Sequence, residues 1–268
     1  MMIFKQFILK TMIRLFGAKG FSKMYLATSK SKTYSIFCEK VYGRDLCQAN
    51  MFDEEQLQKL LTSLNLNSSH NLLDIGCGIG KIGEFISDST GASFTGVDFA
   101  YGAIGDAQVR TESKKEKVSF LVGNLNNLKD VIFEQYDAIV LIDSLYFVSD
   151  MPKCIESMKS FLKPNGKLIV FYSSTKKPSD NSFDLLPQNK PVGIALTQSG
   201  FAYETYDFTV NEKKIWEKSF HVAQELKASF IEEGNSEIYK SRIAEAKRNL
   251  KVHEKELILR NLYVATLQ

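Results

Sequence analysis

A loop of alternating glycines between two acidic side chains is the feature of this sequence that carries most chemical information. The loop runs from Gly76 to Gly80, Asp74 precedes it by two positions, and Asp98 lies downstream. Glycines at this spacing allow a tight turn and a close approach of a ligand to the backbone. The apolar residues 71–75 predict a strand before the loop, and residues 81–87 predict a helix whose N-terminus faces the turn. The pattern therefore predicts a ligand site.

Two kinds of ligand are compatible with this loop. The stretch from Gly78 to Gly83 also reads G-x-G-x-x-G, and Asp98 suits the ribose hydroxyls of NAD. Asp74, however, can engage a cationic amino group, which S-adenosylmethionine carries and a dinucleotide lacks near its pyrophosphate. Further polar residues, Asn124 and Asp143, follow the third and fourth predicted strands, at the sheet edge where such folds bind ligands. The residues therefore favour S-adenosylmethionine.

The elements that must position this loop alternate between strands and helices. Alternation of this kind predicts an α/β fold, here a Rossmann-like, doubly wound, mostly parallel seven-stranded sheet. The predicted strands cover residues 71–75, 93–97, 118–122, 136–142, 167–172, 202–209 and 261–267.

Helical additions flank this domain on both sides. Residues 1–52 predict an N-terminal helical cap, and residues 53–268 predict the main domain, with a helical insertion at about 210–256. Asp53 is expected to cap a helix whose leucines recur with helical spacing from Leu57 to Leu64. Both additions are expected to form a lid.

From about residue 70 to 173, the chain resembles the class I S-adenosylmethionine-dependent methyltransferases. Residues 73–80 are similar to the first motif of that family and residues 96–99 to its second. Residues 136–140 resemble its fourth strand, and residues 162–168 resemble its hairpin into the fifth strand.

The resemblance implies a role for each matching residue. Asp74 orients the methionine amino group, Asp98 accepts both ribose hydroxyls, and Phe99 flanks the adenine. Asn124 stands where the family often has Asp, and its amide oxygen can accept the bond from the adenine amino group. The implied cofactor-binding residues are Asp74, Gly76, Cys77, Gly78, Gly80, Asp98, Phe99, Asn124, Leu125 and Asp143.

Candidates for catalysis lie after the fourth strand and in the helical insertion. Asp143 and Tyr146 belong to a segment with the outline of D-P-P-Y but without its prolines, which counts against methylation of DNA adenine. Tyr146 is a candidate for lining the methyl-transfer site, although packing explains it equally well. His221 or His253 can serve as a general base if the acceptor must lose a proton, although surface positions are their simpler interpretation.

The substrate is expected to be a small molecule, because a closed lid suits it better than a folded macromolecule. An aromatic pocket and two polar groups are the candidates for contacting it: Tyr25, Tyr34, Phe37, Tyr42, Arg44, Gln48, Tyr146 and Trp216. Arg44 and Gln48 can alternatively hold the cofactor carboxylate. Packing is the simpler explanation for each single aromatic residue.

Charge and cysteine content set further limits. Residues 1–50 hold nine basic and two acidic side chains, a net charge of +7, whereas the whole chain carries +3. The total charge is too small to indicate a nucleic-acid partner by itself, and a solvated helix face is favoured over an anion-binding patch for the basic segment. Contact of residues 1–16 with a membrane surface is an alternative to simple packing. The four cysteines show no metal-binding spacing, so no metal is expected, and a reducing cytoplasm is the expected location.

The sequence thus predicts a methyltransferase that acts on a small molecule with S-adenosylmethionine. The alternatives are an RNA or protein methyltransferase, an NAD-dependent oxidoreductase, and a non-catalytic binding or scaffold protein.

Overall fold

The structure is a computed structural model that describes residues 17–177 and 179–267. Seven strands form one sheet in the order β3-β2-β1-β4-β5-β7-β6. Their bounds are β1 Asn71–Ile75, β2 Ser93–Asp98, β3 Val118–Val122, β4 Tyr136–Ile142, β5 Leu162–Thr175, β6 Phe201–Asp207 and β7 Ile258–Leu267. β7 pairs antiparallel with both β5 and β6, and the pairs among β1 to β5 are parallel. The predicted mostly parallel seven-stranded sheet is confirmed.

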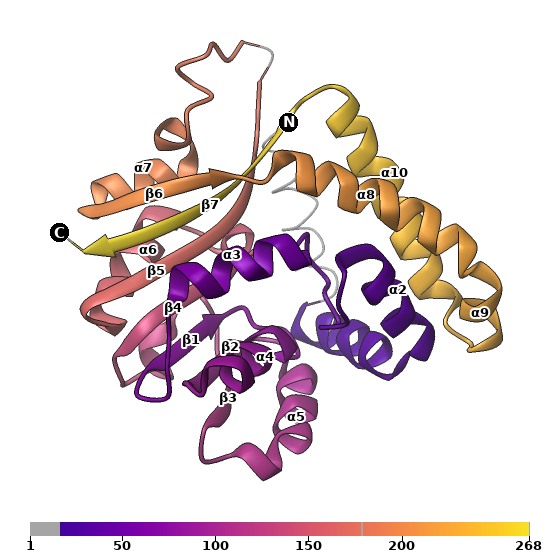
Figure 1. Cartoon of the computed structure of the whole chain (residues 1–268), viewed down its shortest axis with the longest axis horizontal. Helices are drawn as coiled ribbons and strands as arrows, with labels where there is room; N and C mark the ends of the chain where they lie inside the picture. Colours follow the sequence, from indigo (N-terminus) through magenta and orange to yellow (C-terminus); the bar gives the residue numbers. More distant parts are fainter. Residues whose placement is uncertain (1–16, 178, 268) are drawn as a thin grey trace.

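Helices cover both faces of this sheet (Figure 1). Their bounds are α2 Lys32–Tyr42, α3 Glu54–Leu64, α4 Lys81–Thr90, α5 Tyr101–Arg110, α6 Met151–Met158, α7 Pro191–Gln198, α8 Thr209–Glu225, α9 Lys227–Glu232 and α10 Ser236–Glu254. Residues 17–30 are also helical, and a 3-10 turn, η3 (Leu145–Phe147), follows β4. Asp53 accepts from the Gln56 N–H and caps α3 as predicted.

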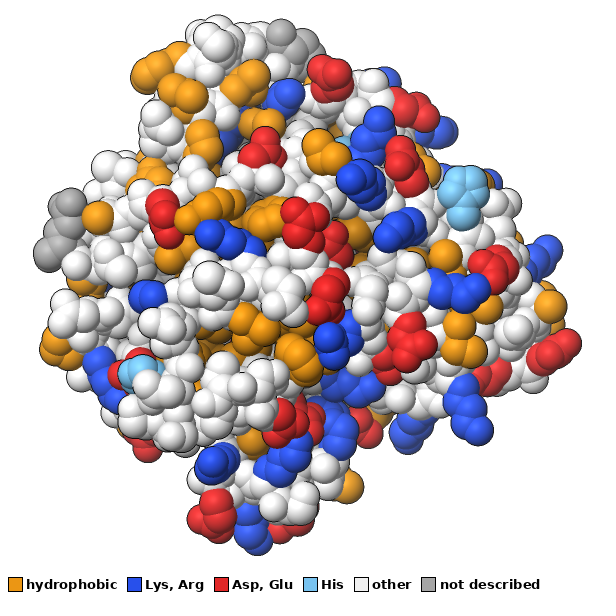
Figure 2. Space-filling view, viewed as in Figure 1, with side chains coloured by type: hydrophobic (Ala, Val, Ile, Leu, Met, Phe, Trp, Pro, Cys, Tyr) orange, Lys and Arg blue, Asp and Glu red, His pale blue; other side chains and the backbone are white. Residues whose placement is uncertain are grey.

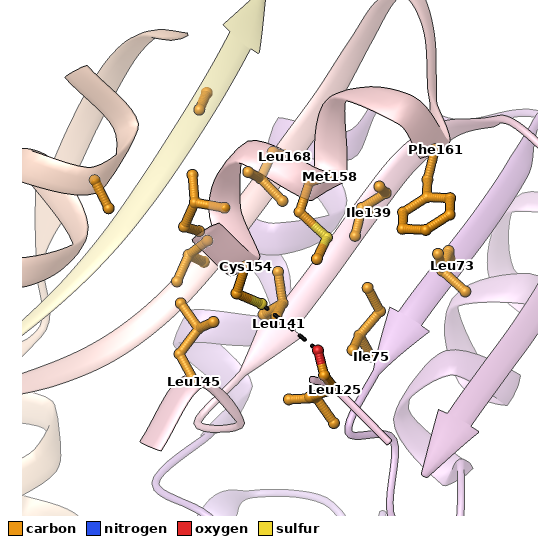
Figure 3. Close-up of a cluster of buried hydrophobic side chains, with 14 of the residues drawn as sticks. Leu73, Ile75, Leu125, Ile139, Leu141, Leu145, Cys154, Met158, Phe161 and Leu168 are labelled. Carbon is orange, nitrogen blue, oxygen red and sulfur yellow. Dashed lines mark hydrogen bonds between the residues drawn. The ribbon is translucent and has the colours of Figure 1, made fainter. Parts of the chain in front are cut away.

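Alternating side chains of the strands supply two cores. On one face, α6 and α7 pack on Leu73, Ile139 and Leu168. Figure 3 shows Cys154 and Met158 of α6 against these strands, with the thiol of Cys154 directed to the carbonyl of Leu125. On the other face, α3, α4 and α5 pack on the neighbouring strand residues. The doubly wound arrangement follows from strands that are apolar on both sides.

Among the strands, β5 differs most from its predicted boundaries. Residues 162–168, expected to form the hairpin into the fifth strand, lie inside β5, where the register with β4 shifts between Tyr136 and Ala138. Asn165 takes a positive φ of 63° there. A left-handed residue with continued pairing produces a bulge, so the chain turns without ending the strand.

The N-terminal helices and the helical insertion meet in a third core. Figure 1 shows α8, α9 and α10 gathered beside α2, away from the helices that cover the sheet faces. Phe37 and Val41 of α2 pack with Ile215 of α8 and Phe230 of α9. The predicted insertion at about 210–256 is thus three helices. The division into a cap of residues 1–52 and a domain of residues 53–268 stays a prediction, and residues 1–16 lie outside the described part.

Glu233, directly after α9, fastens the insertion to the N-terminus of α2. Its carboxylate accepts from the Ser31 hydroxyl at 2.6 Å and from the N–H groups of Lys32 and Thr33 at 2.6 and 3.3 Å. Burial alone would raise the pKa of Glu233, but these hydrogen bonds lower it to about 2. Glu233 thus places an anionic acceptor at the N-terminus of α2, beside the N-cap residue Ser31.

We predict that Glu233→Ala lowers the free energy of unfolding by about 0.5–2 kcal/mol, the usual value of a lost helix cap. Because the folded pKa is depressed, this stabilisation is complete above about pH 4.5 and disappears as pH falls toward 2. Urea unfolding at pH 7 measures the loss, with the neighbouring and likewise exposed Glu232→Ala as control. Equal stability of the two variants at pH 7 would contradict the assigned cap.

Candidate functional site

The glycine loop joins β1 to α4 and is held against β2. The N–H groups of Gly76 and Cys77 both donate to the carbonyl of Val97, at 2.7 and 3.1 Å. All three glycines of the loop have positive φ, between 58° and 83°. Side chains at these positions are strained, so the backbone conformation accounts for the spacing of the glycines.

The protein itself packs closely on these glycines. A Cβ atom at Gly76 would lie 2.4 Å from the Cβ of Ser144, and one at Gly78 would lie 3.0 Å from the ring of Tyr25. At Gly80 it would lie 2.0 Å from the ring of Phe120. The sequence argument assigned the space above the loop to the cofactor, whereas the Cβ directions of these glycines point to protein side chains.

Asp74 and Asp98 form a buried acidic pair beside the loop. Asp74 is 5% exposed and Asp98 is 3% exposed. Burial, and then the charge of Asp98, raise the pKa of Asp74 to about 7. Burial also raises the pKa of Asp98, although its carboxylate accepts from the N–H groups of Gly78 and Ala100 at 2.9 and 2.8 Å. Two carboxylates in this setting favour a cationic or hydroxyl-bearing ligand.

The other predicted cofactor residues lie around this pair in different environments. Phe99 is half-buried against Phe21, with ring centroids 5.2 Å apart. Asn124 is exposed, and its Oδ1 already accepts from the backbone N–H of Asn126 at 2.9 Å. Leu125 is buried in the core beneath α6. Their contacts with a cofactor stay predictions.

A helix that the sequence argument did not place covers the loop. Within residues 17–30, Ser22 accepts from the N–H of Gly102 at 3.0 Å and so binds the start of α5. Phe21 packs edge-on against both Phe99 and Phe147. Tyr25 lies over Gly78, and burial, followed by the charge of Asp98, raises the pKa of its phenol well above the usual value. Of these covering residues, Tyr25 was a candidate for lining an aromatic pocket, whereas no sequence signal marked Phe21 or Ser22.

Asp143, directly after β4, is held by a fully buried arginine of β7. Arg260 donates to both carboxylate oxygens of Asp143, at 2.8 and 3.0 Å, and its Nε donates to Gln56 at 2.7 Å. Arg260 has 0% exposure and Asp143 has 9%. Asp143 also adopts φ 54°, a left-handed conformation that non-glycine residues seldom take. The predicted cofactor residue Asp143 is therefore engaged by the protein.

A second buried acid, Glu212 of α8, continues this network. Its carboxylate accepts from the hydroxyl of Ser173, which also accepts from Arg260 at 3.1 Å. Trp216 donates to Glu212 at 3.3 Å, and the Nε2 of His253 lies 3.5 Å from the same oxygen. The network thus joins β4, β5, β7, α8 and α10 through polar side chains.

Of the three catalytic candidates, two lie in this network. Tyr146 donates to Asp143 at 3.3 Å, accepts from the N–H of Ser173 at 2.6 Å and stacks on Tyr172. Burial, and then the charge of Asp143, raise the pKa of Tyr146 well above its usual value, so its phenol stays protonated at neutral pH. His253 is buried beside Glu212, whereas His221 is exposed on α8 with its ring against Phe220. The surface interpretation therefore fits His221 and not His253.

The remaining substrate candidates serve contacts within the protein. Tyr34 and Phe37 stack on each other in the third core, and Tyr42 is buried there with them. The amide of Gln48 closes the loop between residues 44 and 48, and Tyr34 donates to the carbonyl of Gln48 at 2.6 Å. Arg44 pairs with Glu54 at 2.9 Å and lies over the ring of Phe85. Contact of these residues with a substrate stays a prediction.

No role at the site was predicted for Arg260, Glu212, Ser173 or Gln56, although Gln56 was expected in the capping box of α3. The predicted final strand began at residue 261, one position after Arg260, whereas β7 begins at Ile258 and includes this lone cation among mostly apolar residues. Such a residue in a central strand must find a buried partner. The partner is 117 positions away, and no spacing rule connects the two.

The fold and the loop together define the class I methyltransferase architecture. Residues 66–235, more than half of the chain, match the family model described as a methyltransferase domain, so the chain belongs to that family. It is 22% identical over 231 residues to phosphoethanolamine N-methyltransferase 1 of Triticum aestivum, an alignment that covers 82% of this chain and 46% of the relative. The chain therefore spans about half the length of the curated relatives it matches.

Solved structures share the fold. A Haemonchus contortus phosphoethanolamine N-methyltransferase 2, in complex with phosphomonomethylethanolamine and S-adenosylhomocysteine, gives a TM-score of 0.71 at 20% identity, covering 88% of this chain and 57% of that one. A cyclopropane synthase of Mycobacterium tuberculosis gives 0.68 at 17% identity, covering 89% and 95%. Within the described residues, no helix is both long and apolar enough to cross a membrane.

We predict that Arg260→Met destabilises the fold by about 3–5 kcal/mol, because it leaves the buried charge of Asp143 uncompensated. Arg248→Met, which removes an exposed arginine of α10, is the matched control and should stay within about 0.5 kcal/mol. Adding Asp143→Asn to Arg260→Met should restore part of the loss. Urea unfolding measures all three, and a double variant no more stable than Arg260→Met would contradict the assigned pairing.

The raised pKa of Asp74 predicts that the stability of the unliganded protein depends on pH. Its pKa is about 7 in the folded state and near 3.8 in the unfolded chain. Between these pH values, the folded protein binds a proton at Asp74 that the unfolded chain has lost. Stability should therefore fall as pH rises through this window, with a contribution of at most about 1.4 kcal/mol per pH unit. Asp74→Asn should flatten the fall between pH 5 and 7, and the exposed Asp130→Asn should leave it unchanged. Identical pH slopes in wild type and Asp74→Asn would refute the raised pKa.

Proposed function

We propose that this protein transfers a methyl group from S-adenosylmethionine to a small-molecule acceptor. Support comes from its membership of the methyltransferase-domain family and from relatives named as N-methyltransferases of phosphoethanolamine. A structure of similar fold carries S-adenosylhomocysteine together with a phosphobase.

The observation that carries the proposal is the buried pair Asp74 and Asp98 beside the glycine loop. Both carboxylates are desolvated, and the charge of one raises the pKa of the other. A pyrophosphate would add two negative charges to this site, whereas the ammonium and sulfonium of S-adenosylmethionine bring positive charge. The electrostatics therefore favour this cofactor over a dinucleotide.

The residues present fit the cofactor. Each oxygen of Asp98 accepts one backbone N–H and keeps a lone pair for a ribose hydroxyl. Asp74, once ionised, pairs with the ammonium group, and Phe99 offers its ring to the adenine. Asn124 can accept a hydrogen bond from the adenine amino group only through its Oδ1, which already accepts from the N–H of Asn126.

When bound, S-adenosylmethionine supplies a methyl group already activated on sulfur. The chain has to align the acceptor and exclude water, and alignment of this kind is worth about 7–11 kcal/mol. Phe21, Phe99 and Phe147 form an apolar cover beside the loop. Tyr146 is protonated and Asp143 is paired with Arg260, so we assign alignment, and not proton removal, to these two residues.

The covered site supports a small acceptor. Residues 17–30 lie on the glycine loop and on the start of α5, where a folded macromolecule would have to displace them. Figure 2 shows acidic and basic side chains interspersed on the visible face, unlike the single-sign surface expected for a nucleic-acid partner. We therefore favour a small molecule over RNA or protein.

Titration calorimetry with S-adenosylmethionine, S-adenosylhomocysteine, NADH and NADPH tests the cofactor. We expect micromolar binding of the first two and none of the nicotinamide cofactors. Asp98→Ala should greatly weaken binding, and Asp98→Asn is the matched variant because its amide oxygen retains one acceptor for the loop. Gly78→Val should also abolish binding, since the new side chain meets Tyr25 and strains the loop.

Binding of NADH alone would overturn the proposal, as would unchanged affinity in Asp98→Ala. An assay of labelled methyl transfer to a panel of small amines and acids then identifies the acceptor. The panel includes phosphoethanolamine, because relatives are named for it. Methylation of RNA or protein substrates, without any of these small molecules, would contradict the proposed acceptor class.

A further inference from the structure

Ser144 carries a buried hydroxyl that no residue in the described part of the chain satisfies. The side chain is 4% exposed, and its Oγ has no hydrogen-bond partner there. A hydroxyl taken out of water without a partner destabilises a fold, so such a group calls for an explanation.

The hydroxyl lies against the glycine loop. A Cβ atom placed on Gly76 would be 3.1 Å from Ser144 Oγ and 2.4 Å from its Cβ. Gly76 follows Asp74 by two residues, so Ser144 faces the end of the loop nearest the carboxylate that is proposed to hold the cofactor ammonium. In the sequence, this serine lies inside the segment with the outline of D-P-P-Y, at the position of the first missing proline, but no role was predicted for it.

The position of Ser144 is imposed by its neighbour. Asp143 is fixed by the bidentate contact with Arg260, and its own N–H donates to the carbonyl of Phe171 at 3.1 Å. The left-handed backbone of Asp143 then directs the next residue toward β1. The turn that leaves the hydroxyl unsatisfied is therefore held by a buried ion pair, and does not relax toward solvent.

We propose that Ser144 binds the amino-acid end of the cofactor, with its hydroxyl donating to the carboxylate of the methionine moiety. This inference rests on the proposed function. A serine hydroxyl provides one donor, and a hydrogen bond to a charged acceptor is stronger than one to a neutral group. Asp74 would then take the ammonium and Ser144 the carboxylate, so that both charges of the amino acid are matched.

The test compares two ligands that differ in the amino-acid end. S-adenosylhomocysteine contains it, and 5′-methylthioadenosine lacks it while keeping the adenosine and the sulfur. Ser144→Ala should weaken S-adenosylhomocysteine binding about tenfold or more, the usual effect of a lost bond to a charged group, and leave 5′-methylthioadenosine binding unchanged. Calorimetry measures both, and thermal unfolding of the unliganded variant checks the fold.

Ser219→Ala is the matched control. Ser219 is 2% exposed on α8, and its hydroxyl likewise has no partner in the described part of the chain. The same atom is removed from an equally buried site, so neither ligand should lose affinity.

Three results would count against the inference. Unchanged S-adenosylhomocysteine binding in Ser144→Ala would overturn it. An equal loss for both ligands would also overturn it, because the serine would then act through the shape of the whole site. If the unsubstituted protein bound neither ligand, the proposed function itself would fail, and the inference with it.

Discussion

The buried ion pair between Arg260 and Asp143 is the constraint on which the rest of the site depends. A charge buried in the interior must be compensated, and here the ion pair joins the end of β4 to β7, across the intervening β5. Gln56 and Ser173 satisfy further donors of the guanidinium, so α3 and β5 share the same anchor. The turn after β4 is thereby fixed beside the glycine loop, and the network continues through Glu212 into the helical insertion.

This arrangement separates two kinds of acid within one site. Asp143 and Glu212 have partners of the protein's own, whereas burial and mutual charge leave Asp74 with a pKa of about 7. Asp143 and Glu212 stabilise the fold, whereas Asp74 can change its protonation state when a ligand binds. Perturbed acids with no compensating cation are a common mark of functional sites. His253, buried 3.5 Å from Glu212, likewise differs in its surroundings from the exposed His221.

The sequence predicted the parts of the fold that depend on local pattern. The order of strands and helices, the cap of α3 by Asp53 and the meeting of Asp74 and Asp98 at one turn follow from periodicity and from the topology of parallel sheets. The contacts of Arg260 and the lid contacts of Phe21 and Tyr25 did not follow, because they join residues far apart in the chain. Aromatic residues such as Tyr34 were expected at a pocket, but hydrophobicity alone cannot distinguish a pocket wall from a core.

The antiparallel insertion of β7 between β5 and β6 has a consequence for how the protein is made. The guanidinium that neutralises Asp143 is encoded 117 residues later, and its contact with Gln56 spans 204 residues. During synthesis, a chain that has already exposed β1 to β5 still lacks the strand and the cation that complete the sheet. Non-local contacts of this kind slow folding, and unpaired strand edges attract other chains. A growing chain therefore leaves the β5 edge without its neighbouring strand until β7 has been made.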